Sequence, residues 1–424
     1  MLKATKHTLP SGLRIIFAQM PDSPTVTVQV LVETGSKYES KKEAGLSHFL
    51  EHMCFKGTKK RPGAFSVSKA FDELGAVSNA FTSTEITGYW AKAGFNNVLP
   101  ILDIVADIYL NSVFKDEDVK TERGVITEEI NRGEDQPANV LDRIFDKAMH
   151  GDQPAGLPII GNKKTVHAFK AKDFYDYRGK HYVACATTIV VSGRFNEKEV
   201  LKEIKNLFKD ISKSKKYEKK PTKIAHRKPN VVFEHKDIDQ VHIEIGMRAF
   251  PYKDDRLPKL SVLKGVLSSG MSSRLYQKMR TELGICYYVR AFNSCSTDHG
   301  EFGVVSGVDP KRVDIAVGAI INELEKIKSE LVSEEELKKV KSLMISGMYM
   351  SLESSDEVGG YFADRAIFSG DLRTPQEREK IILAVTPKDI QNIAKELFTN
   401  KDLLLAVVGR KIDKPKLARL LNIK

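Results

Sequence analysis

The chain has 424 residues, of which 41% are hydrophobic and 29% charged, a composition typical of a globular protein with two or three domains. Its formal charge of +11 could suit nucleic-acid binding, but the excess is dispersed or lies in the tract KSKKYEKKPTK at 213–223, without an RNA-binding or zinc-finger motif. No apolar run approaches the roughly 20 residues of a membrane span. We therefore expect no nucleic-acid partner and no membrane partner.

The cysteines and the N-terminal residues indicate the cellular compartment of the protein. None of the cysteines has C-x-x-C spacing, which argues against a disulfide framework and against a cysteine zinc site. The N-terminal stretch HTLPSGLRIIF is typical of a turn and a strand, not of a secretory or transit segment. These features predict a cytoplasmic location.

The first strongly patterned segment is TVTVQVLVETG at 25–35, where valines alternate with mostly polar residues. That period of two predicts a half-buried strand with one polar face.

The next segment, GLSHFLEHMCFKGT at 45–58, holds two histidines and a carboxylate within five residues. His48 and His52 are four apart, so on a helix both rings project from one face with the spacing that brings two imidazoles to one tetrahedral Zn²⁺. Glu51 completes an H-x-x-E-H pattern, the inverse of the zincin motif. The alternative is a pair of helical histidines with ordinary hydrogen bonds.

A third zinc ligand must come from elsewhere, and DEDVKTERGVITEEINRGED at 116–135 is the candidate segment. Glu122 and Glu129 are seven apart and share one helix face, whereas Glu128 points about 100° away from Glu129. The alternative for such an acidic helix is a solvated surface with no ligand.

The chain also repeats itself. KDFYDYRGKHYVACATTIVVSGRF, which starts at residue 172, is echoed by KDIQNIAKELFTNKDLLLAVVGRK, which starts at residue 388. Two copies of one fold are the economical interpretation, with domains at 1–212 and 224–424 and a charged linker at 213–223. Strands followed by runs of helices predict an α+β class, with helices covering a largely antiparallel sheet in each copy.

Several sequence segments together resemble those of one protein family. HFLEHMCFKGT, LGAVSNAFTSTEITGYW, ERGVITEE and GLPIIGNKKTV occur in the order and spacing of the M16 (pitrilysin-like) metallopeptidases, and GMSSRLYQKMRTELGICYYVRAF continues the likeness into the second copy. The chain is most similar to the short branch that includes the β-subunit of the mitochondrial processing peptidase. The resemblance implies two homologous domains that form half of a clamshell.

Carried over by position, the family's zinc ligands fall on His48, His52 and Glu129, and its catalytic base falls on Glu51. Glu122 matches a carboxylate that supports the ligands in relatives. This sequence has Glu128 where relatives usually have arginine, which adds a competing carboxylate beside Glu129.

The resemblance also marks residues that handle substrate. Arg280 and Tyr287 match the pair with which the family holds the substrate carbonyl and the tetrahedral intermediate, whereas Asn79 and Ala80 match the edge strand that pairs with an extended substrate.

Together these features imply a zinc-dependent endopeptidase with one Zn²⁺ per chain, acting on peptides or unfolded segments bound as an extended strand in a closed chamber. Because the second copy lacks H-x-x-E-H but carries Arg280 and Tyr287, we expect a homodimer in which each chain completes the other's site. The alternative is a catalytically inactive M16-like scaffold or assembly subunit.

Overall fold

The computed structural model describes residues 2–226 and 228–424. The chain forms two compact units, each described here by itself. Unit 1 contains residues 1–131, 157–220 and 350–374, and unit 2 contains residues 132–156, 221–349 and 375–424. No helix within the described ranges is long and apolar enough to cross a membrane.

The sheet of unit 1 has six strands in the order β1-β2-β6-β3-β5-β4, with β2 and β6 parallel and the other neighbours antiparallel. Its strands are β1 (Ala4–Thr8), β2 (Arg14–Gln19), β3 (Thr25–Val32), β4 (Val77–Thr82), β5 (Thr87–Gly94) and β6 (Thr187–Gly193). The helices of this unit are α1 (Leu46–Met53), α2 (Ala64–Asp72), α3 (Val98–Asn111), α6 (Lys163–Ala168), α7 (Ala171–His181), α8 (Glu197–Leu207) and α12 (Ser355–Phe368), together with most of α4 (Asp116–Asp135).

The sheet of unit 2 has five strands in the order β7-β11-β8-β10-β9, with β7 and β11 parallel and the rest antiparallel. Its strands are β7 (Asn230–His235), β8 (Val241–Ala249), β9 (Cys286–Cys295), β10 (Gly300–Val308) and β11 (Leu404–Gly409). Its helices are α5 (Pro137–His150), α9 (Leu257–Ser268), the π-helix η5 (Tyr276–Glu282), α10 (Val313–Ser329), α13 (Pro375–Ala384), α14 (Pro387–Leu397), α15 (Lys414–Leu420) and nearly all of α11 (Glu334–Met350). Short 3₁₀ turns are η1 (Ser36–Tyr38), η2 (Phe95–Asn97), η3 (Pro154–Gly156), η4 (Ala184–Ala186) and η6 (Pro310–Arg312).

The two sheets repeat one topology. The series β2-β6-β3-β5-β4 corresponds strand by strand to β7-β11-β8-β10-β9, with the same pairing directions. The echoed segments form equivalent elements, α7 and β6 in unit 1 and α14 and β11 in unit 2. The predicted α+β class with two homologous, largely antiparallel sheets is therefore confirmed.

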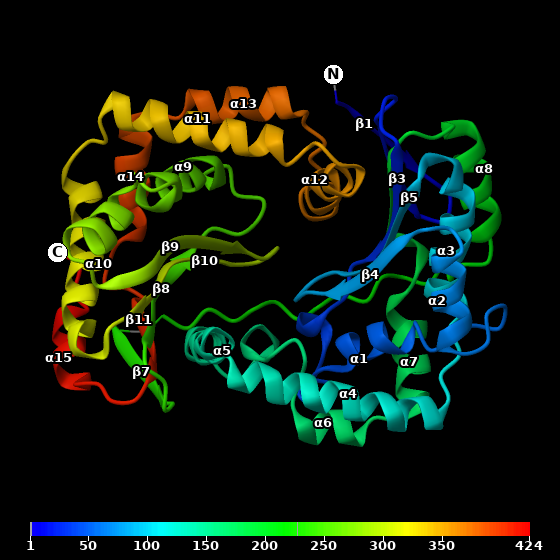
Figure 1. The fold of residues 1–424 in the computed structure, drawn as a ribbon, viewed down its shortest axis with the longest axis horizontal. Coiled ribbons are helices and arrows are strands. Elements are labelled where there is room, and N and C mark those ends of the chain that lie inside the picture. The colour runs from blue at the N-terminus through cyan, green and yellow to red at the C-terminus, as the bar shows by residue number, and fades with distance from the viewer. Residues whose placement is uncertain (1, 227) are drawn as a thin grey trace. The chain divides into compact units, whose positions relative to one another are not determined.

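Each sheet is covered on one face by a helix from the other half of the sequence. In unit 1, α3 packs on one face and α12 lies on the opposite face against β2, β3 and β6 (Figure 1). In unit 2, α5 packs on β7, β8 and β11 in the corresponding way, with α9 and α14 on the other face. Along the sequence, the boundary between the main parts of the two units falls between Lys220 and Pro221, inside the predicted linker. Two helices are exceptions: α5 belongs to unit 2 although it precedes this boundary, and α12 belongs to unit 1 although it follows it.

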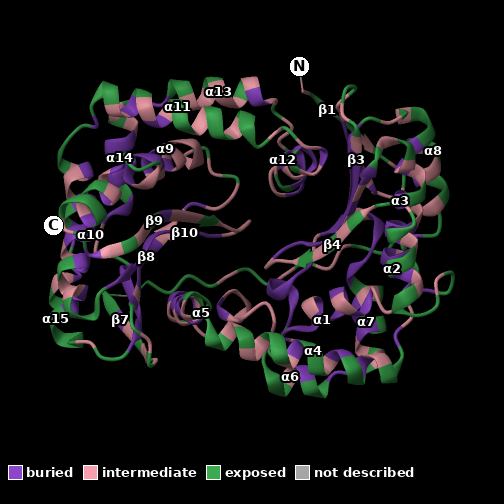
Figure 2. Ribbon diagram, in the orientation of Figure 1, coloured by how far each residue is buried: buried purple, intermediate pink, exposed green. Residues whose placement is uncertain are grey.

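The predicted half-buried strand at 25–35 is instead buried on both faces, as the purple colour of β3 in Figure 2 shows. Thr27 is fully buried, and its hydroxyl is 2.8 Å from that of Ser355 on α12. Gln29 donates to the carbonyl of Asp356 at 3.4 Å. The polar face of the strand therefore bonds a helix instead of water, which the alternation alone did not predict.

Candidate active site

Helix α1 begins at a close approach of two backbone segments. Gly45 has φ +94°, and a Cβ there would lie 2.6 Å from the carbonyl oxygen of Ile160, so only glycine fits. The carboxylate of Glu39 accepts from the backbone N–H of Gly45 at 2.8 Å and of Ser47 at 2.6 Å, which satisfies donors of the first turn. Burial raises the pKa of Glu39 to about 7. The apolar face of α1, formed by Leu46, Phe49, Leu50 and Met53, packs into the unit 1 core.

The other face of α1 brings its two histidines to one carboxylate of α4. The Nε2 atom of His48 lies 3.6 Å from Oε1 of Glu129, and Nε2 of His52 lies 3.7 Å from Oε2 of the same carboxylate. These separations are too long for hydrogen bonds. They match the roughly 3.4 Å between neighbouring ligands of a tetrahedral zinc with bonds of about 2.1 Å. The donor set therefore fits a zinc ion better than it fits a hydrogen-bonded cluster.

The charge state of the first histidine also suits a ligand. Burial, with a smaller contribution from His52, lowers the pKa of His48 to about 4. His48 is thus uncharged at neutral pH, as a metal-binding imidazole must be.

Glu122 fixes the orientation of the second histidine. Its Oε1 atom accepts from Nδ1 of His52 at 2.8 Å, which leaves Nε2 of that ring to face Glu129. Burial alone would lower the pKa of His52, but the bond to Glu122 and the surrounding carboxylates raise it overall. Burial would likewise raise the pKa of Glu122, but bonds from His52 and Lys56 hold it below its usual value. Lys56 forms the second ion pair of this carboxylate.

Glu51 lies on the same helix and is only 9% exposed. Its Oε2 atom accepts from the hydroxyl of Thr82 at 2.7 Å, which fixes one oxygen of the carboxylate. Burial raises its pKa above the usual value, against the bond from Thr82 and the charge of His52. A buried carboxylate with a raised pKa beside a metal-ligand set is suited to accept and return a proton.

Thr82 and Lys56 were not among the residues predicted from sequence. In the structure Thr82 shares the partly buried side of β4 with Ala80, but the sequence of the strand did not connect it to Glu51. No pattern along the chain pointed to Lys56.

The competing carboxylate of α4 lies elsewhere. Glu128 is exposed and accepts from the amide of Asn131 at 3.3 Å, whereas Glu129 faces both histidines. The seven-residue spacing from Glu122 thus selects the carboxylate that meets the histidines.

The predicted substrate residues lie on the last strand of the unit 1 sheet. β4 pairs with β5 and ends the strand order, so its other edge is the outer edge of the sheet. Asn79 is exposed, and its side-chain oxygen accepts from the N–H of Ala80 at 2.8 Å. Ala80 packs against the core.

Arg280 and Tyr287 come together within unit 2. Arg280 lies on η5, where its guanidinium donates to the carbonyl of Tyr287 and lies 5.1 Å from the centroid of that ring. Tyr287 is skipped in the pairing of β9 with β10, a β-bulge, and is 71% exposed. Bulges of this kind redirect side chains out of a sheet edge. The pair is therefore formed and open to a ligand.

Comparison with known proteins agrees with this geometry. Residues 14–163 match the family model described as insulinase (peptidase family M16), and residues 168–344 match the peptidase M16 inactive domain. A protein of Rickettsia bellii named "Uncharacterized zinc protease" is 32% identical over 95% of this chain and 96% of its own length.

Solved structures share the whole fold. A protease from Helicobacter pylori superposes with a TM-score of 0.89 at 23% identity, over 96% of this chain and 100% of that one. A chain of Complex III2 from Candida albicans superposes with a TM-score of 0.84 at 18% identity, over 98% and 99% of the two chains. The matches over both halves and the full-length relative show that the chain belongs to the M16 family of zinc peptidases.

Proposed function

We propose that the protein is a zinc-dependent endopeptidase that cleaves peptides or unfolded segments bound as extended strands. The observation that carries the proposal is the meeting of His48, His52 and Glu129 at separations of 3.6 and 3.7 Å, with Glu51 on the same helix. These residues supply two imidazole nitrogens and one carboxylate, and so leave one position of a tetrahedral zinc open, as catalytic sites require. One ion per chain at this site is part of the proposal.

A zinc ion held there supplies a Lewis acid that lowers the pKa of water to about 7. The protein's own contribution is proton transfer and orientation. Thr82 holds one oxygen of Glu51, so that the other can accept a proton as water attacks a peptide carbonyl and later deliver it to the leaving amine. Glu122 keeps the ring of His52 in place throughout.

The outer edge of β4 supports extended binding of the substrate. An edge strand offers a row of backbone donors and acceptors to an added strand, and recognition of backbone favours broad specificity. A folded protein cannot present such a strand without opening. We therefore propose unfolded segments or peptides as substrates, enclosed in a chamber during cleavage.

The site on unit 1 also needs groups that stabilise the oxyanion. Tyr287 offers a phenol on an exposed bulge of unit 2, and Arg280 on η5 offers a guanidinium beside it. We propose a homodimer in which this pair completes the metal site of the partner chain. A mixed dimer of Glu51→Gln and Arg280→Ala chains should then regain part of the activity, because one of its two sites keeps every group. Verified mixed dimers without any recovery would contradict completion in trans.

An inactive scaffold is the second candidate, because the same fold occurs in a chain of Complex III2 from Candida albicans. Metal content, oligomeric mass and cleavage of a quenched peptide library, measured on one preparation, separate the candidates. The peptidase predicts bound zinc and cleavage that stops in Glu51→Gln. Zinc-loaded protein that cleaves no member of the library would favour the scaffold. The cytoplasmic location stays a prediction.

A further inference from the structure

Unit 2 contains a second group of two histidines and a glutamate, on elements that the peptidase site does not use. His150 is the last residue of α5, His299 lies in the turn before β10, and Glu301 is the second residue of β10. One nitrogen or oxygen from each lies within 4.8 Å of the others. The three residues are 6%, 8% and 6% exposed, so this group is more deeply buried than the site on unit 1, where the Glu129 side chain is 46% exposed.

The group resembles the metal-ligand set of unit 1 in how its two histidine rings lie. The rings of His150 and His299 lie 4.6 Å apart at 59°, and those of His48 and His52 lie 4.7 Å apart at 55°. Each set has a glutamate that faces the rings, but Nε2 of His150 hydrogen-bonds Glu301 directly, whereas the histidine nitrogens of unit 1 lie 3.6 and 3.7 Å from Glu129. A bound ion would take the place of this hydrogen bond.

The Nδ1 atoms of the histidines also have similar surroundings in the two groups. Nδ1 of His299 donates to Asp298 at 2.8 Å, as Nδ1 of His52 donates to Glu122, and this leaves Nε2 of His299 as an acceptor. Nδ1 of His150 is buried and finds no hydrogen-bond partner in the described parts of the chain, as is the case for Nδ1 of His48. A carboxylate that holds a histidine in one tautomer is the usual support of a metal ligand.

Further carboxylates lie around the group. Asp146 lies one turn before His150 on α5, and burial together with Glu301 and Asp142 holds its pKa well above the usual value. Glu244 on β8 is 3% exposed, and burial and these same carboxylates raise its pKa too, against the charge of Arg290. Negative charges that raise one another's pKa inside a protein favour a bound cation.

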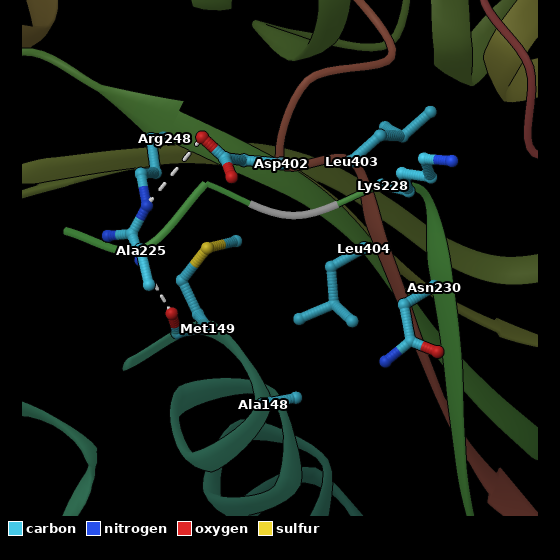
Figure 3. A pocket seen from close by; sticks show the side chains of 9 residues that line it. All are labelled: Ala148, Met149, Ala225, Lys228, Asn230, Arg248, Asp402, Leu403 and Leu404. Carbon is cyan, nitrogen blue, oxygen red and sulfur yellow. Dashed lines mark hydrogen bonds and ion pairs between the residues drawn. The ribbon is translucent and has the colours of Figure 1, made fainter. Parts of the chain in front are cut away.

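The backbone beside the group is fixed. Arg248, the partner of Glu301 across β8 and β10, donates to the carbonyl of Met149 at 2.6 Å and lies 3.8 Å from Asp402. Figure 3 shows this side chain between the end of α5 and Asp402. Asp298 in turn accepts from the N–H of Thr222 at 2.8 Å. Both ends of the ligand set are therefore held by contacts outside it, as a preformed metal site requires.

We propose that His150, His299 and Glu301 bind a second divalent transition-metal ion, of which zinc is the best match to a set of two imidazoles and one carboxylate. The ion joins the last turn of α5 to the start of β10. It thereby fastens the helix that unit 2 receives from the first half of the sequence to the sheet it covers. Its role is structural, and it does not depend on the proposed peptidase activity.

The test begins from a full-length variant that lacks the first site. A His48→Ala, Glu129→Gln chain is saturated with Zn²⁺, freed of excess metal by gel filtration and analysed by mass spectrometry for metal. We expect about one zinc per chain in this variant and about two in the wild type. Adding His299→Gln should remove the remaining ion, whereas adding His235→Gln, which changes an exposed histidine of the same unit, should not. Substitution with Co²⁺ gives an independent reading through the absorption bands of a tetrahedral site.

Hydrogen exchange measures the structural role. Removing metal from the His48→Ala, Glu129→Gln chain should increase exchange in α5 and leave α3 of unit 1 unchanged. Less than about 0.2 zinc per folded chain of this variant would overturn the proposal, because its unit 2 is unaltered. Retention of the ion after His299→Gln would overturn it as well.

Discussion

The carboxylate of Glu122 allows a quantitative test of how the first site is held. Its bond to Nδ1 of His52 is 2.8 Å long, and the carboxylate side chain is only 5% exposed. A hydrogen bond to a charged group contributes about 1.5–3 kcal/mol, and loss of a carboxylate behind a ligating histidine typically weakens metal binding about 10- to 100-fold. The two estimates agree, so we expect Glu122→Ala to weaken zinc binding by about 10- to 100-fold and Glu122→Gln, which keeps an acceptor, by about 10-fold.

Competition against a chromophoric chelator at fixed pH measures this affinity. Lys56 loses its partner in these variants, but its side chain is 24% exposed and can turn to water, so no buried charge is stranded. Glu197→Ala is the matched control, because Glu197 bonds His7 at 3.0 Å in the same unit, away from the metal ligands. That variant should bind zinc as the wild type does. A folded Glu122→Ala chain with unchanged zinc affinity would refute the argument.

Three further predictions concern unit 1. Glu51→Gln should keep its zinc while kcat falls by about 10²–10⁴; near-normal cleavage would remove Glu51 as the base. Thr82→Val should lower kcat about 10-fold through loss of one hydrogen bond to a carboxylate, with recovery in Thr82→Ser; equal loss in both variants would point to packing instead. Burial lowers the pKa of His181 to about 3, so the unfolded chain binds the extra proton below about pH 6.5. The contribution of His181 to stability therefore falls as the pH drops below that value, by up to about 2 kcal/mol at pH 5. Urea unfolding followed by Trp90, the single tryptophan, should show this contribution as a pH-dependent difference in stability between the wild type and His181→Gln.

The meeting of the two histidines with Glu129 was predictable from residue spacing together with the family resemblance. His48 and His52 four residues apart share a helix face, and Glu129 shares one with Glu122 two turns earlier. The structure places both pairs as the helical period requires. Thr82 was harder, because its partner Glu51 lies 31 residues away and no local period joins a strand to a helix.

Local sequence patterns could not predict that α12 covers the polar face of β3. Thr27 and Gln29 gave the strand a polar face, which normally indicates solvent. Here the partner of Thr27 is Ser355, 328 residues further on, and it arrives on a helix from the other half of the chain. Polar residues that bury themselves by bonding a distant helix look the same in sequence as residues that face water.

The duplication places two kinds of chemistry at equivalent points of one fold. β4 and β9 end the two strand series, and α1 and α9 pack on them in turn. The first copy carries H-x-x-E-H on its helix, whereas the second carries Tyr287 on its edge strand, displaced outward by a bulge, with Arg280 beside it. Neither edge alone provides both a metal-ligand set and groups for a developing negative charge. Because peptide hydrolysis needs both at one carbonyl, the proposed peptidase requires a β4-type edge and a β9-type edge over one substrate, and the proposed homodimer would supply them from two copies of the chain.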